Sequence, residues 1–370
     1  MLKKIAYIGI KGLPSKGGAE RVVEAITERL KDKYKIFIYC NKRYTPNAYS
    51  SPGIELIRIP TLPGKYLQPL SLFFFSALHA LLLGNFDLIH LHNAEAGFIN
   101  PLLRLKYKVI ATSHGPAYSR EKWGKMAKVL IKLIDTPFIF FSDRVTSVSL
   151  PIANEYEEKW KRKIDYIPNG VEHNMPINKK AALNTLHHHR VDGEYILFLA
   201  GRMDRTKGCH LLLKAFSDIE TDLKLVVVGD SQTDPDYYKE LKSLANEKVR
   251  FIPFIADKGE LFGILSGAHI FIFPSTVEAM SMALLEAASL GVPIICSDIA
   301  SNKAVLPEQA LFFRSEAIDN FREKLEWALT HPAEMREMGL RAQEWVKKEF
   351  SWDLIADKYD TLFQGVMNHG

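Results

Sequence analysis

The chain has 370 residues, 47% of them apolar and 25% charged, a composition typical of a soluble globular protein with room for two domains. Its three cysteines, Cys40, Cys209 and Cys296, are far apart, which excludes a disulfide-stapled scaffold and favours a reducing cytosol. Residues 1–180 hold 28 Lys and Arg against 15 Asp and Glu, whereas residues 181–370 have a net charge of −8, so the first half either meets an anionic partner or presents a solvated basic face.

Short apolar strands alternate with helical stretches in the first half of the chain. The first apolar run, residues 4–10, follows two lysines as in a signal peptide, but it ends within a few residues and no cleavage site follows. We therefore interpret it as a buried strand. The other strands predicted in this half are residues 35–40, 54–59, 87–92, 108–113, 144–149 and 165–168.

Two stretches in this half bear on membrane contact. Residues 67–83 are strongly apolar, but they contain Pro69 and His79 and fall short of the ~20 residues that a bilayer span needs, which predicts a buried helix. Residues 119–135, SREKWGKMAKVLIKLID, place lysines around an apolar face. This pattern predicts weak contact with an anionic membrane, and a core-packed surface helix is the alternative.

Residues 172–193 are polar and irregular, and we expect them to connect two domains. A second alternating series follows, and residues 315–367 are expected to be helical. Two doubly wound parallel sheets, with a ligand cleft between the carboxyl ends of their strands, are therefore predicted. The strands of this second series are residues 195–201, 223–229, 249–254, 269–274 and 293–297.

The segment EAMSMALLE places two glutamates eight positions apart after a strand. Ser281 is a candidate helix N-cap, so Glu278 would lie in the preceding loop and Glu286 about five residues into an apolar helix. The helix N-terminus offers a diphosphate site at Met280–Met282, with Glu286 accepting from a ribose and Glu278 facing a sugar. The alternative for Glu286 is a buried acid with a structural partner. A glycosidase pair is disfavoured, because eight helical residues span ~12 Å and such acids lie ~5–9.5 Å apart.

Two basic residues, Arg202 and Lys207, follow the first strand of the second series in the turn GRMDRTKG. Cations at this position can offset the charge that develops on a leaving diphosphate. A pair of ordinary surface charges is the alternative. Asp204 in the same turn is expected to be a turn residue.

Glycines and one histidine mark the strand ends of the first half. Gly17 and Gly18 lie between a strand and a helix, where backbone amides can approach a ligand closely. The spacing of Gly9 and Gly12 is not the G-x-G-x-x-G fingerprint, which argues against a dehydrogenase. His114 ends another strand and is either a sugar-binding or proton-handling group or a satisfied structural histidine.

These residues together resemble the GT-B retaining glycosyltransferases of family 4. The resemblance runs along the chain through GGAER, the His-Gly pair at 114–115, YIPNGV, GRMDRTKG and the E-x7-E segment. The stretch HGPAYSREKWGKMAK is also similar to a bacterial rhamnosyltransferase-like subgroup. The resemblance implies an α/β GT-B fold of two Rossmann-like domains, with an acceptor domain at 1–171, a linker at 172–193, a donor domain at 194–350 and a helix at 351–370 packing back on the first domain.

The resemblance also implies roles for individual residues. His114 would lie beside the transferred sugar, and with Arg202, Lys207 and Glu278 it would form the catalytic set. One departure is clear: Ala279-Met280-Ser281 follows Glu278 where the family often has Gly-Phe-Gly, which puts the choice of donor in doubt. The implied donor-binding residues are Gly17, Gly18, Arg202, Lys207, Glu278, Ala279, Met280, Ser281, Met282 and Glu286.

The expected activity is metal-independent, retaining transfer from a nucleotide sugar to a glycan or lipid-linked acceptor, in the cytoplasm or peripherally on the inner face of the membrane. No cofactor and no nucleic-acid partner are expected. A sugar epimerase or a sugar-phosphate synthase on the same fold is one alternative, and a non-catalytic two-domain ligand-binding protein is another. Nucleic-acid binding would need interleaved aromatic and basic residues, and the 119–128 segment supplies only one Trp.

Overall fold

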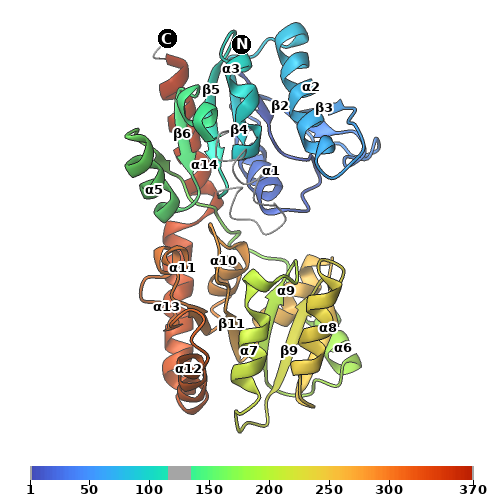
Figure 1. Cartoon of the computed structure of the whole chain (residues 1–370), viewed down its shortest axis with the longest axis vertical. Coiled ribbons are helices and arrows are strands. Elements are labelled where there is room, and N and C mark those ends of the chain that lie inside the picture. The colour runs from blue at the N-terminus through green and yellow to red at the C-terminus, as the bar shows by residue number, and fades with distance from the viewer. Residues whose placement is uncertain (1, 116–134, 369–370) are drawn as a thin grey trace. The chain divides into compact units, whose positions relative to one another are not determined.

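The structure, a computed structural model, describes residues 2–115 and 135–368 and contains two units, each built on one parallel sheet (Figure 1). Unit 1 comprises Met1–Gly170 and Trp352–Gly370, and unit 2 comprises Val171–Ser351. Two doubly wound sheets are the architecture that the alternating sequence pattern predicts, and this prediction is confirmed. The amphipathic segment at 119–135 lies, except for Asp135, outside the described residues.

The described strands of unit 1 run parallel in the order β3-β2-β1-β4-β5-β6-β7. Successive connections reverse direction between β1 and β4, so right-handed crossovers place the first helix, α1, on one face of the sheet and α2 and α3 on the other. The strands are β1 (Lys4–Ile8), β2 (Lys35–Asn41), β3 (Ile54–Ile59), β4 (Leu88–His92), β5 (Lys108–Ser113), β6 (Arg144–Ser147) and β7 (Asp165–Tyr166). The helices are α1 (Gly18–Leu30), α2 (Leu67–Leu83), η1 (Ala94–Ile99), α3 (Asn100–Leu103), α5 (Leu150–Trp160) and α14 (Trp352–Asn368).

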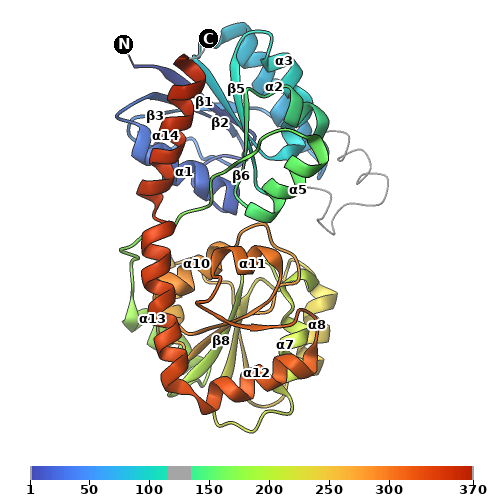
Figure 2. The ribbon, with the colours of Figure 1, turned by 90° about the vertical axis from the view of Figure 1, so that its left-hand side faces the viewer.

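The C-terminal helix α14 packs on α1 within unit 1 (Figure 2). Asp360 of α14 accepts from the Tyr34 hydroxyl at 2.5 Å and from the Lys33 ammonium at 2.7 Å. Arg29 pairs with Asp353 at 2.6 Å. These contacts join the two ends of the sequence into one core, because Tyr359 and Phe363 of α14 are buried there.

Unit 2 has a sheet of the order β10-β9-β8-β11-β12-β13, which reverses between β8 and β11. Its apolar core contains residues of α7 and α12 packed on β8, β9 and β11. The strands are β8 (Tyr195–Ala200), β9 (Lys224–Gly229), β10 (Val249–Pro253), β11 (Ile270–Phe273), β12 (Ile294–Ser297) and β13 (Leu311–Phe313). The helices are α6 (Lys179–His188), η3 (Arg205–Lys207), α7 (Cys209–Phe216), α8 (Pro235–Leu244), α9 (Lys258–Ser266), α10 (Met282–Ser289), α11 (Ala300–Val305), α12 (Ile318–Thr330) and α13 (Pro332–Glu349).

Two details differ from the sequence expectations. The expected irregular connection over 172–193 contains α6, which packs on α9 and begins with Asn178 accepting from the Ala181 amide at 3.0 Å. Ala182 and Leu186 are buried on one side of α6, a periodic pair that the surrounding polar residues obscure. Helix α2 is not fully buried: it buries Ser71, Leu72, Phe73, Ser76, Ala77 and Ala80 and exposes much of its opposite side.

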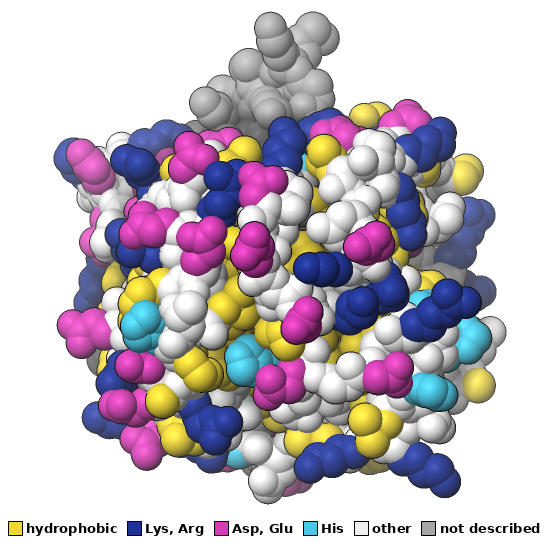
Figure 3. All heavy atoms as spheres, turned by 90° about the horizontal axis from the view of Figure 1, so that it is seen from below, with side chains coloured by type: hydrophobic (Ala, Val, Ile, Leu, Met, Phe, Trp, Pro, Cys, Tyr) yellow, Lys and Arg dark blue, Asp and Glu magenta, His cyan; other side chains and the backbone are white. Residues whose placement is uncertain are grey.

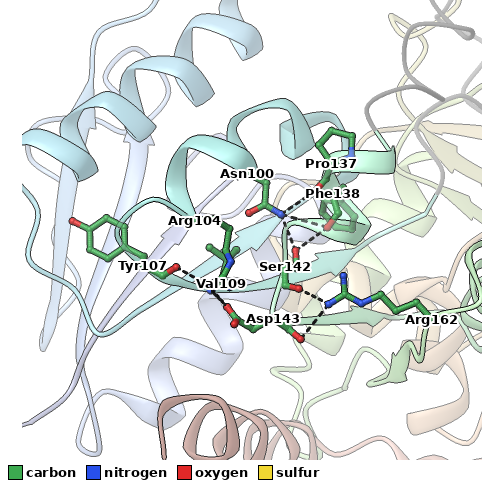
Figure 4. Close-up of polar contacts among 9 residues, drawn as sticks. All are labelled: Asn100, Arg104, Tyr107, Val109, Pro137, Phe138, Ser142, Asp143 and Arg162. Atoms are coloured by element: carbon green, nitrogen blue, oxygen red, sulfur yellow. Dashed lines mark hydrogen bonds and ion pairs between the residues drawn. The ribbon is translucent and has the colours of Figure 1, made fainter. Parts of the chain in front are cut away.

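A polar network holds the region around β5 and β6 together (Figure 4). The Asp143 carboxylate accepts from the Arg104 guanidinium at 2.9 Å and from the Val109 amide at 2.7 Å. Arg162 donates to the backbone carbonyls of Ile139, Ser142 and Asp143, at the end of the helical residues 135–140. A cation at the carboxyl end of a helix satisfies carbonyls that the helix leaves without partners. We therefore assign these residues a structural role.

Candidate functional site

A buried polar pair of unit 2 lies where the strand order of its sheet reverses, at the carboxyl ends of β8 and β11. The turn after β8 provides Lys207, the loop after β11 provides Glu278, and Lys207 Nζ lies 2.5 Å from Glu278 Oε1. Both side chains are mostly buried, with 20% and 11% exposure. Open α/β sheets bind ligands at such reversal points, so the sequence-predicted pair lies where a ligand site is expected.

The two loops contact each other directly. The Thr276 amide donates to the Thr206 carbonyl at 2.8 Å. Gly208 has a φ of +70°, and a Cβ there would lie 2.1 Å from the Pro274 carbonyl oxygen. A side chain at Gly208 would therefore force the two loops apart, which explains the glycine that ends GRMDRTKG.

The helix N-terminus of the E-x7-E segment is formed as predicted. Ser281 is the N-cap of α10, and its hydroxyl accepts from the Leu284 amide at 3.4 Å. Glu286 is the fifth residue of the helix and is buried, with 4% exposure. Met280 and Ser281, which precede the helix, are also buried. The first amides of a helix lack intrahelical acceptors and carry its positive dipole end, so this terminus can bind an anion.

Arg202 differs from Lys207 in its surroundings. Its side chain is 63% exposed, and its guanidinium lies 3.8 Å from Asp204 Oδ2. Asp204 itself caps the short helix η3 by accepting from the Thr206 amide at 3.1 Å, as its interpretation as a turn residue predicts. The structure thus pairs Lys207 with Glu278. It leaves the Arg202 side chain largely exposed to solvent, where a ligand could contact it.

The other predicted residues, Gly17, Gly18 and His114, belong to unit 1. Gly17 is the N-cap of α1, and a Cβ there would lie 2.4 Å from Glu20 Oε2. Glu20 is buried and accepts from the Lys11 amide at 3.2 Å, so this carboxylate holds the loop after β1. At Gly18 a Cβ would meet nothing within 4 Å, which leaves open space for a ligand.

A cluster of aromatic and imidazole rings surrounds the predicted His114, and the sequence interpretation missed two of its members. His92 Nδ1 lies 2.9 Å from His114 Nε2, with the rings stacked. His90 Nε2 lies 2.7 Å from the Thr112 hydroxyl. The two missed histidines are two positions apart in β4, in DLIHLH. Side chains two apart in a strand lie on the same face of the sheet, and this spacing could have predicted that they lie together.

Burial keeps both β4 histidines neutral. It lowers the pKa of His90 to about 3, with a contribution from His114, and it lowers the pKa of His92 well below the usual value. Among the described residues, His92 Nε2 has no hydrogen-bond partner. A buried N–H without an acceptor is less favourable than a bare ring nitrogen, so we assign the proton of His92 to Nδ1, from which it donates to His114 Nε2.

Because of these buried histidines, we expect the folded protein to become less stable as the pH falls. Between the unfolded pKa near 6.5 and the folded value of about 3, the unfolded chain binds a proton that native His90 does not, so the free energy of unfolding falls as pH decreases. The loss is about 1.4 kcal/mol per pH unit for each such histidine. Urea denaturation between pH 7 and pH 5 would measure it. His90→Gln should flatten the pH dependence of unit 1 unfolding, whereas the exposed-site control His188→Gln should not; equal curves for the two variants would contradict the assignment.

Two family models match the chain. The Glycosyltransferase Family 4 model matches residues 16–174. The Glycosyl transferases group 1 model matches residues 187–345. Each match covers most of one parallel sheet, and together they include Gly17, His114, Lys207 and Glu286.

Curated relatives and solved structures agree with these matches. A UDP-galactose-dependent α-1,3-galactosyltransferase of Escherichia coli, acting on a GlcNAc-diphosphoundecaprenol, is 25% identical over 86% of each chain. A D-rhamnosyltransferase of Pseudomonas aeruginosa is 28% identical over 60% of each chain. A sucrose-phosphate synthase of Thermosynechococcus elongatus has a TM-score of 0.83 at 22% identity, covering both chains fully. Anabaena HepE in complex with UDP-glucose has a TM-score of 0.79 at 17% identity, covering 97% of this chain and 99% of the other.

Proposed function

We propose that this chain, which belongs to glycosyltransferase family 4 and is a nucleotide-sugar glycosyltransferase of the GT-B fold, transfers its sugar with retention of configuration and without a metal ion. The observation that carries the proposal is the Lys207–Glu278 pair in front of the α10 N-terminus, at the reversal point of the unit 2 sheet. A cation, a carboxylate and a helix terminus together match the charges of a nucleoside diphosphate sugar.

Each group of unit 2 has a proposed role. Lys207, Arg202 and the amides at Met280–Met282 hold the diphosphate, with Ala279 in the same loop. Glu278 accepts from the sugar hydroxyls while its other partner, Lys207, fixes its position. Glu286 accepts from the ribose. Ribose hydroxyls are hydrogen-bond donors, and hydrogen bonds to an ionised carboxylate are among the strong ones.

The proposed reaction breaks the bond between the anomeric carbon and the diphosphate oxygen and forms a bond from that carbon to the acceptor oxygen on the same face. The acceptor hydroxyl proton passes to the departing phosphate. Negative charge grows on the diphosphate as the bond breaks, and Lys207, Arg202 and the helix N-terminus stabilise it, as a metal ion does in other enzymes.

In unit 1, His114 is proposed to lie beside the transferred sugar. With His92 donating to His114 Nε2, a proton carried by a neutral His114 would reside on Nδ1. The loop at Gly17 and Gly18 is proposed to approach the phosphates through its backbone amides.

The proposed acceptor is a glycan or a lipid-linked sugar in cell-surface polysaccharide or glycolipid synthesis. The supporting observation is the similarity to enzymes of this kind, including the Escherichia coli galactosyltransferase that acts on a diphosphoundecaprenol-linked sugar. We propose cytoplasmic action with peripheral contact at the inner face of the membrane. None of the described helices combines the length and apolarity that a bilayer crossing requires.

A donor screen tests the proposal. UDP, GDP, dTDP and ADP sugars are offered with lipid-linked and free glycan acceptors in the presence of EDTA, and NMR reads the anomeric configuration of the product. We expect transfer from one nucleotide class, with the configuration of the donor kept. An inverted product contradicts retention, and activity that returns only with a divalent cation contradicts metal independence. Conversion of the donor without an acceptor would identify an epimerase instead, and tight binding without any product would identify a binding protein.

A further inference from the structure

Helix α2 exposes a continuous apolar stripe. Its side chains at positions 67, 70, 74, 78 and 82 follow the helical repeat along one face, and all are exposed, from 43% at Leu70 and Leu78 to 71% at Leu82. Leu62 and Tyr66 extend the stripe before the helix, and Leu83, Leu102 and Leu105 extend it beyond, with Leu105 79% exposed. Apolar patches of this extent on a soluble protein mark an interaction surface.

The charged side chains on the segments that carry this stripe, residues 56–86 and 96–115, are all basic. Helix α2 has no charged side chain, and the sequence contains no Asp or Glu between Glu55 and Asp87 or from residue 96 to 115. Lys65 lies at the start of the helix and covers the Tyr66 ring at 5.6 Å. At its end, Lys106 donates to the Leu81 and Gly84 carbonyls at 3.0 and 2.8 Å. On the face drawn in Figure 3, by contrast, acidic and basic side chains are interspersed among the apolar ones.

We propose that the exposed face of α2 inserts into the interfacial region of an anionic bilayer, with Lys65 and Lys106 at the level of the lipid headgroups. A helix with an apolar face and basic ends binds such a surface in the plane of the membrane, through buried apolar area and attraction to anionic lipid. The inference rests on the proposed function to the extent that it explains how the enzyme reaches a lipid-linked acceptor, and it assigns the membrane contact to α2.

Charge argues against a second copy of the chain as the occupant of this face. Antiparallel pairing of two α2 helices would place Lys65 opposite Lys106, and parallel pairing would place each lysine opposite its own copy. Neither residues 56–86 nor residues 96–115 supply an acidic partner for these cations across such an interface. Like charges brought together in this way are unfavourable, whereas an anionic bilayer neutralises them.

Co-sedimentation with vesicles tests the proposal. The full chain is mixed with vesicles of phosphatidylcholine alone or of phosphatidylcholine with phosphatidylglycerol, without donor or acceptor. We expect binding that increases with phosphatidylglycerol and falls at least tenfold in Leu70→Gln/Phe74→Gln/Leu78→Gln. Lys65→Gln should reduce mainly the dependence on phosphatidylglycerol. Leu183→Gln/Leu340→Gln, which changes exposed leucines of unit 2, is the matched control and should bind like the wild type.

Three results would overturn the proposal: no vesicle binding by the wild type, equal binding by the triple variant, or a dimer in sedimentation velocity that the triple variant abolishes without any effect of lipid. Nucleotide-induced shifts in unfolding temperature, measured on the same preparations, report on the donor site independently of membrane binding. A triple variant that keeps its nucleotide shift and loses vesicle binding supports the α2 assignment. If the chain binds vesicles but no nucleotide raises its unfolding temperature, the result contradicts the proposed function and still supports membrane binding by α2.

Discussion

Lys207→Ala is expected to lower kcat by at least a hundredfold while unit 2 keeps its fold. The ammonium lies in a mostly buried position at the reversal point of the sheet, where a preorganised charge is worth far more than in water. Removing one such group from a site that stabilises developing negative charge typically costs ~2.7–4 kcal/mol in catalysis. Steady-state kinetics with the matching donor, alongside thermal unfolding of each variant, measures both effects.

The buried ion pair complicates the single substitution, because Lys207→Ala leaves the Glu278 carboxylate without its cation. Glu278→Gln in the same background removes that charge. If the pair is only structural, the double variant should recover affinity for the free nucleoside diphosphate, which lacks the sugar that Glu278 is proposed to contact, along with stability. If Lys207 contacts the diphosphate, as proposed, the double variant binds that nucleotide as weakly as Lys207→Ala does, although its unfolding temperature recovers. The control is Lys239→Ala, at a lysine that is 78% exposed on α8.

The same substitution at Arg202 is expected to lower kcat by a similar factor, with less effect on stability. Its guanidinium is 63% exposed and contacts Asp204 at 3.8 Å, so little of the folded protein depends on it. Full activity of either Arg202→Ala or Lys207→Ala would refute its assignment to the diphosphate.

Local sequence signals predicted the parts of the site that lie within one strand–loop–helix unit. The strand before Pro274, the N-cap at Ser281 and the position of Glu286 within α10 all follow from periodicity and capping, and the structure has them there. The strand order that brings the loops after β8 and β11 side by side is seen in the structure; the right-handed crossover rule allows it but does not select it.

Features that depend on packing between distant segments were harder to predict. The exposed face of α2 is as apolar in sequence as its buried face, so hydropathy alone assigned the whole helix to the interior. The role of His92 depends on β4 pairing with β5, which brings its ring to His114. Helix α6 buries only two side chains within a polar stretch, too weak a period to recognise.

Glu286→Gln is expected to weaken nucleotide binding by ten- to a hundredfold, since a hydrogen bond to a charged group contributes about 1.5–3 kcal/mol. Glu286 is buried, with 4% exposure, so a change in side-chain volume would disturb the packing around it. Glutamine has nearly the same volume and removes only the charge. Titration calorimetry with the nucleoside diphosphate that the screen identifies gives the affinity.

A nucleotide lacking both ribose hydroxyls turns this substitution into a test of contact. If Glu286 accepts from the ribose, the wild type should bind the dideoxy nucleotide as weakly as Glu286→Gln binds the ordinary one, and the variant should hardly distinguish the two ligands. If Glu286 instead supports only its own helix, the variant loses stability without ligand and still prefers the ordinary nucleotide by the wild-type factor. Glu334→Gln, at an exposed glutamate in the first turn of α13, serves as the control and should leave both affinities unchanged. The test therefore compares how much affinity the ribose hydroxyls contribute in the wild type and in Glu286→Gln. A contribution that disappears in the variant shows that the carboxylate holds the ribose.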